Sequence, residues 1–137
     1  MLSIISLLKA YSPQGVHFNE NGVCLYGYVY EFRQKNFYIE FHVIQVNGLW
    51  LGASDYMYPL FGGSSPLMEH HEHYTTLEEC VKDLCEHVLR RTRNGFRSLN
   101  VSYGDKVIKL VEEEFSRLLS SQDLLKEFTE RSLFRYA

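Results

Sequence analysis

The sequence predicts an α+β fold in which an antiparallel sheet of three or four strands, a β-meander, packs against helices. First, apolar side chains alternate along three consecutive segments between residues 23 and 58, and this is the period of a β-strand. Second, Asn47-Gly48 separates the second and third segments and is the strongest two-residue hairpin signal, because both positions need positive φ. Third, apolar residues recur at helical spacing after residue 75.

The first predicted element is a short N-terminal helix with one apolar stripe, formed by Ile4, Leu7, Leu8 and Tyr11. Three strands are expected over residues 23–33, 37–46 and 49–58. Residues 59–74 then form a long connection, and loops of this length are often functional or mobile.

Helices are expected over most of the remaining chain, and residues 96–103 form either a strand or an extended connector between them. One begins at Thr75 or Thr76, which are N-cap residue types, and ends near Arg93, where Asn94-Gly95 is a stop signal. A further helix runs from its cap, Asp105, to about Leu119, and a last one carries Leu124, Leu125 and Phe128.

No repeat or linker divides the chain, so we expect one domain over residues 1–137. Its core is an α-β-β-β-α unit over residues 1–95, and residues 105–136 form a C-terminal helical extension. This extension either packs on the domain or contacts a second copy of the chain.

Charge and composition exclude several classes of protein. The formal net charge is -3, so the overall basic footprint of nucleic-acid binding is missing. The longest apolar stretch, Met1–Leu8, is too short to cross a bilayer and is a poor signal peptide, so we expect a cytoplasmic protein with no membrane partner. The three cysteines follow no disulfide framework, and we expect reduced, mostly buried thiols.

Aromatic side chains form the first candidate binding surface. The chain has ten Tyr, nine Phe and one Trp, concentrated on the expected strands. Subject to register, one side of the sheet is expected to carry Tyr28, Tyr30, Tyr38, Trp50 and Tyr56. Such side chains are enriched at interface hot spots. This face either binds a partner protein or is covered by the C-terminal helices as a second core.

A histidine-rich segment of the long connection is the second candidate. His70, His71 and His73 are possible metal ligands, with Glu69 or Glu72 as an oxygen ligand. The spacing matches no zinc finger and no H-E-x-x-H helix, so a solvated polar loop is the competing interpretation. A metal-binding module or a metal-dependent enzyme is therefore an alternative function.

Four arginines, Arg90, Arg91, Arg93 and Arg97, form a local basic cluster. Cations near the end of a helix complement the helix dipole, which explains them without a ligand. Together with Tyr28 and Tyr30, they also allow a third function, which is the binding of single-stranded nucleic acid.

No catalytic residue is expected. The order Gly62-Gly63-Ser64-Ser65-Pro66 is neither G-x-S-x-G nor a phosphate-binding P-loop. None of the cysteines lies at the start of a helix in an electropositive setting, where reactive thiolates occur. We therefore expect no cofactor.

The predicted element order resembles that of a double-stranded-RNA-binding domain. That family needs basic residues at the start of its second helix, where this chain has Thr75-Thr76-Leu77-Glu78-Glu79. These glutamates would repel phosphates, so this function is excluded.

A second resemblance covers roughly residues 26–93. It is carried by Tyr28, Tyr30-Glu31, Trp50, Asp55-Tyr56, Pro59, Gly62-Gly63-Ser64-Ser65-Pro66, Tyr74, Thr76 and Glu78-Glu79. With these residues the chain resembles small uncharacterised α+β proteins of bacterial plasmids, phages and conjugative elements. The resemblance implies a bacterial or phage origin and an accessory role, and it supplies no catalytic residues.

The sequence thus predicts a non-enzymatic accessory protein that acts by protein–protein binding through the aromatic sheet face. An exposed aromatic face or a helical arm would also favour a two-fold homodimer.

Overall fold

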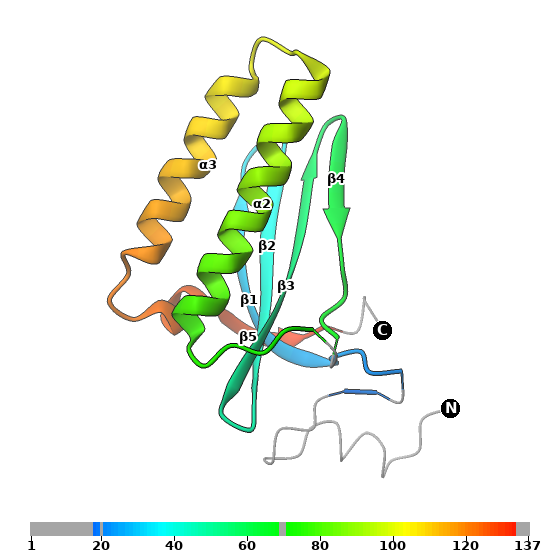
Figure 1. Cartoon of the computed structure of the whole chain (residues 1–137), viewed down its shortest axis with the longest axis vertical. Helices are drawn as coiled ribbons and strands as arrows, with labels where there is room; N and C mark the ends of the chain where they lie inside the picture. The colour runs from blue at the N-terminus through cyan, green and yellow to red at the C-terminus, as the bar shows by residue number, and fades with distance from the viewer. Residues whose placement is uncertain (1–17, 20, 69–70, 134–137) are drawn as a thin grey trace.

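The computed structural model describes residues 18–19, 21–68 and 71–133, and it confirms the α+β class. Within these ranges, one antiparallel sheet lies against two helices (Figure 1). The elements in chain order are β1 (Tyr26–Arg33), β2 (Tyr38–Val46), β3 (Leu49–Tyr58), β4 (Phe61–Ser64), α2 (Leu77–Leu99), α3 (Gly104–Leu119), the 3₁₀ helix η1 (Leu124–Glu127) and β5 (Thr129–Ser132). The helix predicted at the N-terminus lies outside the described residues.

β1, β2 and β3 form the predicted meander. Tyr30 on β1 lies opposite Phe41 on β2, which in turn lies opposite Ser54 on β3. Asn47 and Gly48 reverse the chain between β2 and β3 with φ values of 52° and 80°. The hairpin prediction is confirmed, because both residues occupy the left-handed region that this turn requires.

Two further strands correct the predicted strand count. In the described part of the chain the sheet has five strands, in the order β4-β3-β2-β1-β5. β4 lies inside the connection expected over residues 59–74. β5 replaces part of the expected last helix, of which only the four residues of η1 are helical. Its four residues pair with β1, and this tertiary pairing decides a conformation that so short a segment does not encode alone.

α2 begins as predicted and ends later. Thr76 is the N-cap residue, and its side-chain oxygen accepts a hydrogen bond from the Glu79 N–H at 3.1 Å. The helix continues past Arg93 and stops at Asn100, which has a φ of 53°. Gly95 lies inside the helix and packs against the Phe61 ring, so that a Cβ there would be 2.3 Å from the Cε2 atom of that ring.

α3 ends at Leu119 as expected, but Asp105 does not cap it. The N-cap residue is Tyr103, which makes no side-chain capping bond, and Asp105 lies in the first turn. A carboxylate there still interacts favourably with the helix dipole. No helix in the described ranges is long and apolar enough to cross a membrane.

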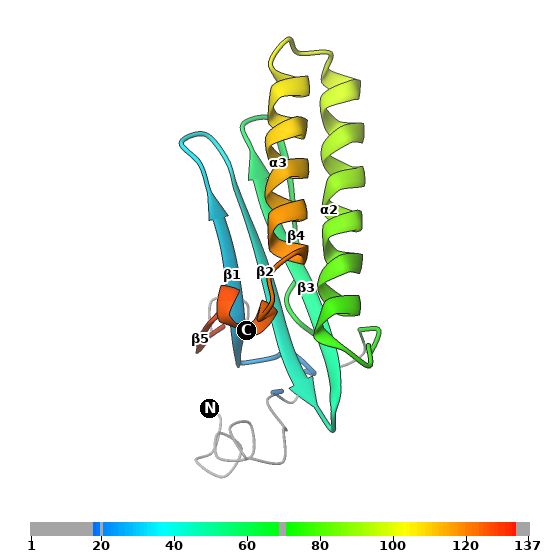
Figure 2. The same cartoon turned by 90° about the vertical axis from the view of Figure 1, so that its left-hand side faces the viewer.

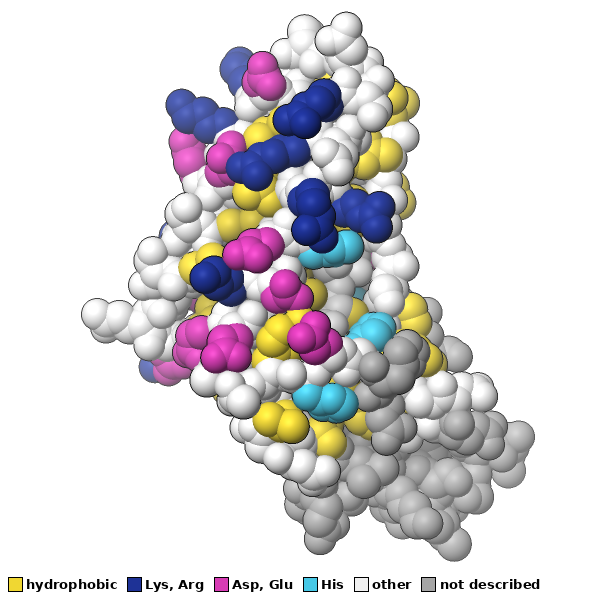
Figure 3. Space-filling view, in the orientation of Figure 1, with side chains coloured by type: hydrophobic (Ala, Val, Ile, Leu, Met, Phe, Trp, Pro, Cys, Tyr) yellow, Lys and Arg dark blue, Asp and Glu magenta, His cyan; other side chains and the backbone are white. Residues whose placement is uncertain are grey.

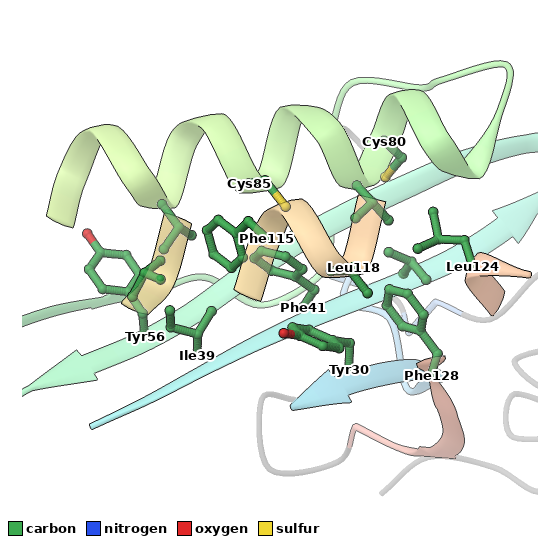
Figure 4. Packing of buried hydrophobic residues seen from close by; sticks show 14 of the residues in the cluster. Tyr30, Ile39, Phe41, Tyr56, Cys80, Cys85, Phe115, Leu118, Leu124 and Phe128 are labelled. Carbon is green, nitrogen blue, oxygen red and sulfur yellow. The ribbon is translucent and has the colours of Figure 1, made fainter. Parts of the chain in front are cut away.

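Both helices cover the same face of the sheet, and the main core lies between the two layers (Figures 1 and 2). Phe41 on the central strand has no exposed surface, and its ring centre lies 5.4 Å from that of Tyr30 and 5.5 Å from that of Phe115 on α3 (Figure 4). The sheet and the helical pair diverge toward the α2–α3 connection (Figure 2). A smaller apolar cluster, which includes Val29, Ile44 and Leu51, lies on the other face of the sheet.

We expect Gly95→Ala to destabilise the protein by about 1–3 kcal/mol. Overpacking against Phe61 should outweigh the roughly 1 kcal/mol that alanine normally contributes to a helix relative to glycine. Urea unfolding measures this change, with the exposed Ser98→Ala in the same helix as the matched control. Phe61→Leu should recover part of the loss in the double variant. A Gly95→Ala protein at least as stable as the parent would contradict the described contact.

Candidate functional site

The sequence left two alternatives for the aromatic face, and in the structure three of its five residues are buried beneath the helices. Tyr30, Trp50 and Tyr56 do share one face, but α2 and α3 cover it, and these three side chains are between 3% and 9% exposed (Figure 4). Alternating register directs them to the same side of the sheet as the helices. They are core residues, and they are not available to a partner.

Tyr30 also has a polar contact that fixes it in this core. Its hydroxyl donates a hydrogen bond to the Glu114 carboxylate on α3. Burial, reinforced by this neighbouring carboxylate, raises the pKa of Tyr30 far above its usual range. The Arg117 guanidinium donates two hydrogen bonds to the same carboxylate at 2.8 and 2.9 Å. The group therefore ties β1 to α3.

The other two predicted aromatics lie elsewhere. Tyr28 is half-buried at the margin of the main core. Tyr38 is on the opposite face, because it is one position out of phase with Ile39 and Phe41. The Arg33 guanidinium lies 4.8 Å from the centre of its ring. The five residues therefore do not form one surface.

A buried polar cluster occupies the opposite face beside Tyr38. The Glu40 carboxylate is 1% exposed and accepts hydrogen bonds from Arg33 at 2.8 Å and from Arg131 at 3.3 Å, and it lies 3.1 Å from His42 Nε2. Burial raises the pKa of Glu31, but hydrogen bonds from Arg131 and Arg33 outweigh it, so this pKa lies below its usual value. Because Arg131 belongs to β5 and Glu40 to β2, the cluster joins three neighbouring strands.

The arginine cluster lies on the exposed side of α2. Arg90, Arg91, Arg93 and Arg97 are all exposed, and only Arg97 falls in the last turn, because the helix continues to Leu99. Figure 3 shows Lys and Arg gathered over the upper half of this face with some acids between them, whereas Asp and Glu predominate below. Arg93 pairs with Glu112 at 3.1 Å, and both side chains are more than 40% exposed, so the pair adds little stability. With Tyr30 buried, the arginines and tyrosines do not form the joint nucleic-acid surface that the third hypothesis needs.

The two predicted metal ligands that the structure describes, His71 and His73, do not share one site. His70 lies outside the described residues. His71 and His73 line two different depressions, and His71 Nδ1 accepts a hydrogen bond from the Met68 N–H at 3.3 Å. Among the described residues, no three His, Cys, Asp or Glu side chains come together in a way that could hold a metal ion.

All three thiols are unsuited to nucleophilic catalysis. Cys24, Cys80 and Cys85 are free and no more than 3% exposed. Burial raises the pKa of the Cys24 thiol to about 11 and those of the Cys80 and Cys85 thiols to about 12. The reactive thiolate form is therefore scarce near neutral pH.

A cavity of about 430 Å³ opens where the sheet and the helical pair diverge. Its lining consists of Gln34, Lys35, Asn36, Phe37, Tyr58, Pro59, Phe96, Tyr103 and Val107. The ring of Tyr58 lies 5.1 Å from both Phe37 and Phe96, and its hydroxyl forms a 2.7 Å hydrogen bond with Thr92. Leu60 and Leu99 at the same end of the fold are 63% and 39% exposed. We call this cavity, with Leu60 and Leu99, the apolar end.

A second cavity, of about 260 Å³, lies at the outer edge of β3, and we call it the edge cavity. It is lined by Gly52, Ala53, Ser54, Ser65, His71, Glu72, Tyr74, Asp83, Leu84, His87 and Arg90. The Tyr74 hydroxyl donates to the Asp83 carboxylate. Burial, followed by the charges of Arg91 and Arg90, lowers the pKa of His87, so this imidazole is neutral at pH 7.

Neither cavity was identified from the sequence. The spacing of Asp83, His87 and Arg90 at i, i+4 and i+7 places them on one side of a helix, and this was the available signal. Comparison of the chain with protein-family models, with curated protein sequences and with solved structures found no match.

We expect the stability of the protein to fall as the pH drops below about 4.5. Hydrogen bonds from Arg117 outweigh the effect of burial and, with the bond from Tyr30, hold the pKa of Glu114 below its usual value of 4.5. A carboxylate with a lowered pKa in the folded state stabilises that state above its unfolded pKa, and this contribution is lost as pH falls through the folded pKa.

Urea unfolding between pH 7 and pH 3 tests this expectation. Glu114→Gln should cost about 1 kcal/mol at pH 7 and should weaken the pH dependence. Glu113→Gln, at an exposed neighbouring position, is the matched control. If the free energy of unfolding of Glu114→Gln decreased with falling pH as much as that of the parent, the carboxylate of Glu114 would not be responsible for the pH dependence.

Proposed function

We propose that the protein is a non-enzymatic accessory module that recognises a partner protein through its apolar end. The proposal rests on an open cavity with an aromatic lining at the same end of the fold as the exposed Leu60 and Leu99. Exposed apolar side chains around a cavity are typical of interaction sites on soluble proteins. The lining offers no carboxylate, imidazole or thiol, the side chains most often used for acid–base or nucleophilic catalysis.

The occupant that fits is a partner segment with one large apolar side chain next to an acidic residue. A cavity of about 430 Å³ is large enough for an aromatic or leucine side chain, and buried anchors of that type dominate binding energies at interfaces. Lys35 is the one charged residue among the lining side chains, and it lies on the exposed turn between β1 and β2. A carboxylate beside the anchor would therefore meet a complementary charge at the rim.

In this proposal the protein works in the cytoplasm, where its three free thiols remain reduced. Binding at the apolar end replaces binding through the sheet face, which the helices occupy.

Peptide selection on the full chain tests the proposal, because it does not depend on knowing the partner. Displayed peptides that bind should be enriched in a large apolar residue adjacent to Asp or Glu. Calorimetry on a selected peptide should show an affinity at least tenfold weaker for Tyr103→Ala, since this side chain lines the cavity and is 41% exposed. Lys35→Glu should also weaken binding.

Two control variants test whether any loss of peptide binding is specific to the apolar end. Leu119→Ala removes a side chain with similar exposure, 40%, at the other end of α3, and Lys126→Glu reverses an exposed charge on η1. Both should bind the peptide as the parent does. The proposal is overturned if no peptide is enriched, or if the control variants lose as much affinity as Tyr103→Ala and Lys35→Glu.

A further inference from the structure

Among the described residues, Gly52 on the outer edge of β3 has no backbone partner in the hydrogen-bonding ladder of that edge. Trp50 exchanges both of its backbone hydrogen bonds with Tyr74, at 2.7 and 2.8 Å. Four residues farther along β3, the Ser54 carbonyl accepts a bond from the Ser65 N–H at 3.3 Å. Alternate residues of a strand direct their N–H and C=O groups to the same edge. Gly52 therefore presents both groups to this edge, between the two pairings.

No backbone group in the described part of the chain fills that position. The chain leaves the edge of the sheet at Ser65 and returns to it at Tyr74. Gly52 is partly exposed and lines the edge cavity, which lies on the side of β3 to which its N–H and C=O are directed. A side chain at this position would collide with α2, because a Cβ would lie 2.7 Å from the Cys80 sulfur. Glycine is thus required for the helix to pack this closely.

Polar side chains with unused hydrogen-bonding capacity surround these two groups. The His87 imidazole and the Arg90 guanidinium line the edge cavity, and neither has a hydrogen bond or an ion pair to another described residue. Tyr74 and His71 add two further planar side chains to the lining. Converging polar groups around a small concave site are the usual features of a ligand pocket.

The geometry points to a binding site for a planar ligand that carries an amide edge, with a C=O and an N–H side by side. Such an edge accepts a hydrogen bond from the Gly52 N–H and donates one to the Gly52 C=O, so one rigid group completes the empty ladder position. Ring amides of nucleobases such as uracil have this edge, and so do primary carboxamides.

Size and shape favour a small ring over a peptide. Trp50 pairs with Tyr74 through both of its backbone groups, and the Ser54 C=O accepts a bond from Ser65. These two residues are about 13 Å apart along the strand, so the edge between them is too short for an added strand of ordinary length. A volume of about 260 Å³ holds one ring system, which can stack against the flat side chains of the wall. This site is separate from the apolar end, and the inference does not depend on the proposed partner binding.

Paired probes with and without the donor N–H test the inference on the full ¹⁵N-labelled chain. Uracil and benzamide have the complete edge, whereas 1,3-dimethyluracil and N,N-dimethylbenzamide have lost the donor. The amide signal of Gly52 should shift with uracil or benzamide and saturate in a titration. The dimethylated probes should bind at least tenfold more weakly. Binding of uracil alone assigns a ring amide, and binding of benzamide alone assigns a primary carboxamide.

Side-chain variants locate the binding. His87→Ala should weaken it at least fivefold, whereas His73→Ala should leave it unchanged, because His73 lies outside the edge cavity. The inference is overturned if the Gly52 signal does not move with uracil or with benzamide. It is equally overturned if the dimethylated probes bind as well as the parent probes, or if the two histidine variants behave alike.

Discussion

The ring of Phe41 has no exposed surface and contacts Tyr30 on β1 and Phe115 on α3, so three elements of the fold meet at one side chain. Burial of the aromatic face of the sheet beneath α2 and α3 is the constraint from which the other features follow. Large aromatic side chains contribute most when they are removed from water. Both helices cover these side chains, and the two cavities described above lie at an end and at an edge of the two layers.

The apolar end is a direct consequence of this arrangement. The two layers are in close contact at Phe41 but diverge toward the α2–α3 connection (Figure 2). Tyr58 and Phe96 are buried there, and their side chains form part of the cavity wall. The edge cavity has a different origin. It forms where the chain loops away from β3 between Ser65 and Tyr74, and α2 closes one side of the opening.

Local sequence patterns were sufficient to predict much of the fold. The alternation along β1, β2 and β3 and the positive-φ turn at Asn47-Gly48 are properties of the segments themselves. The start of α2 was also predictable, because a capping side chain acts on its own first turn.

Features that depend on contacts between residues far apart in the sequence could not be predicted from local patterns. The need for a residue without a Cβ at Gly95 comes from the contact with Phe61, and the four residues of β5 are extended because they pair with the edge of β1. Whether the aromatic face was a core or an interface also depended on where the helices dock, which alternation alone does not encode. The candidate sites are of the same kind: the empty position at Gly52 exists only because Tyr74 and Ser65 pair on either side of it.

The central claim is that the aromatic face is closed, and the single tryptophan reports on it directly. Trp50 belongs to the main core and is 9% exposed. Quenching of its fluorescence by acrylamide should therefore be several times weaker in the native protein than in the urea-unfolded chain. A native quenching constant close to that of the unfolded chain would show that this face is open to solvent and would contradict the account.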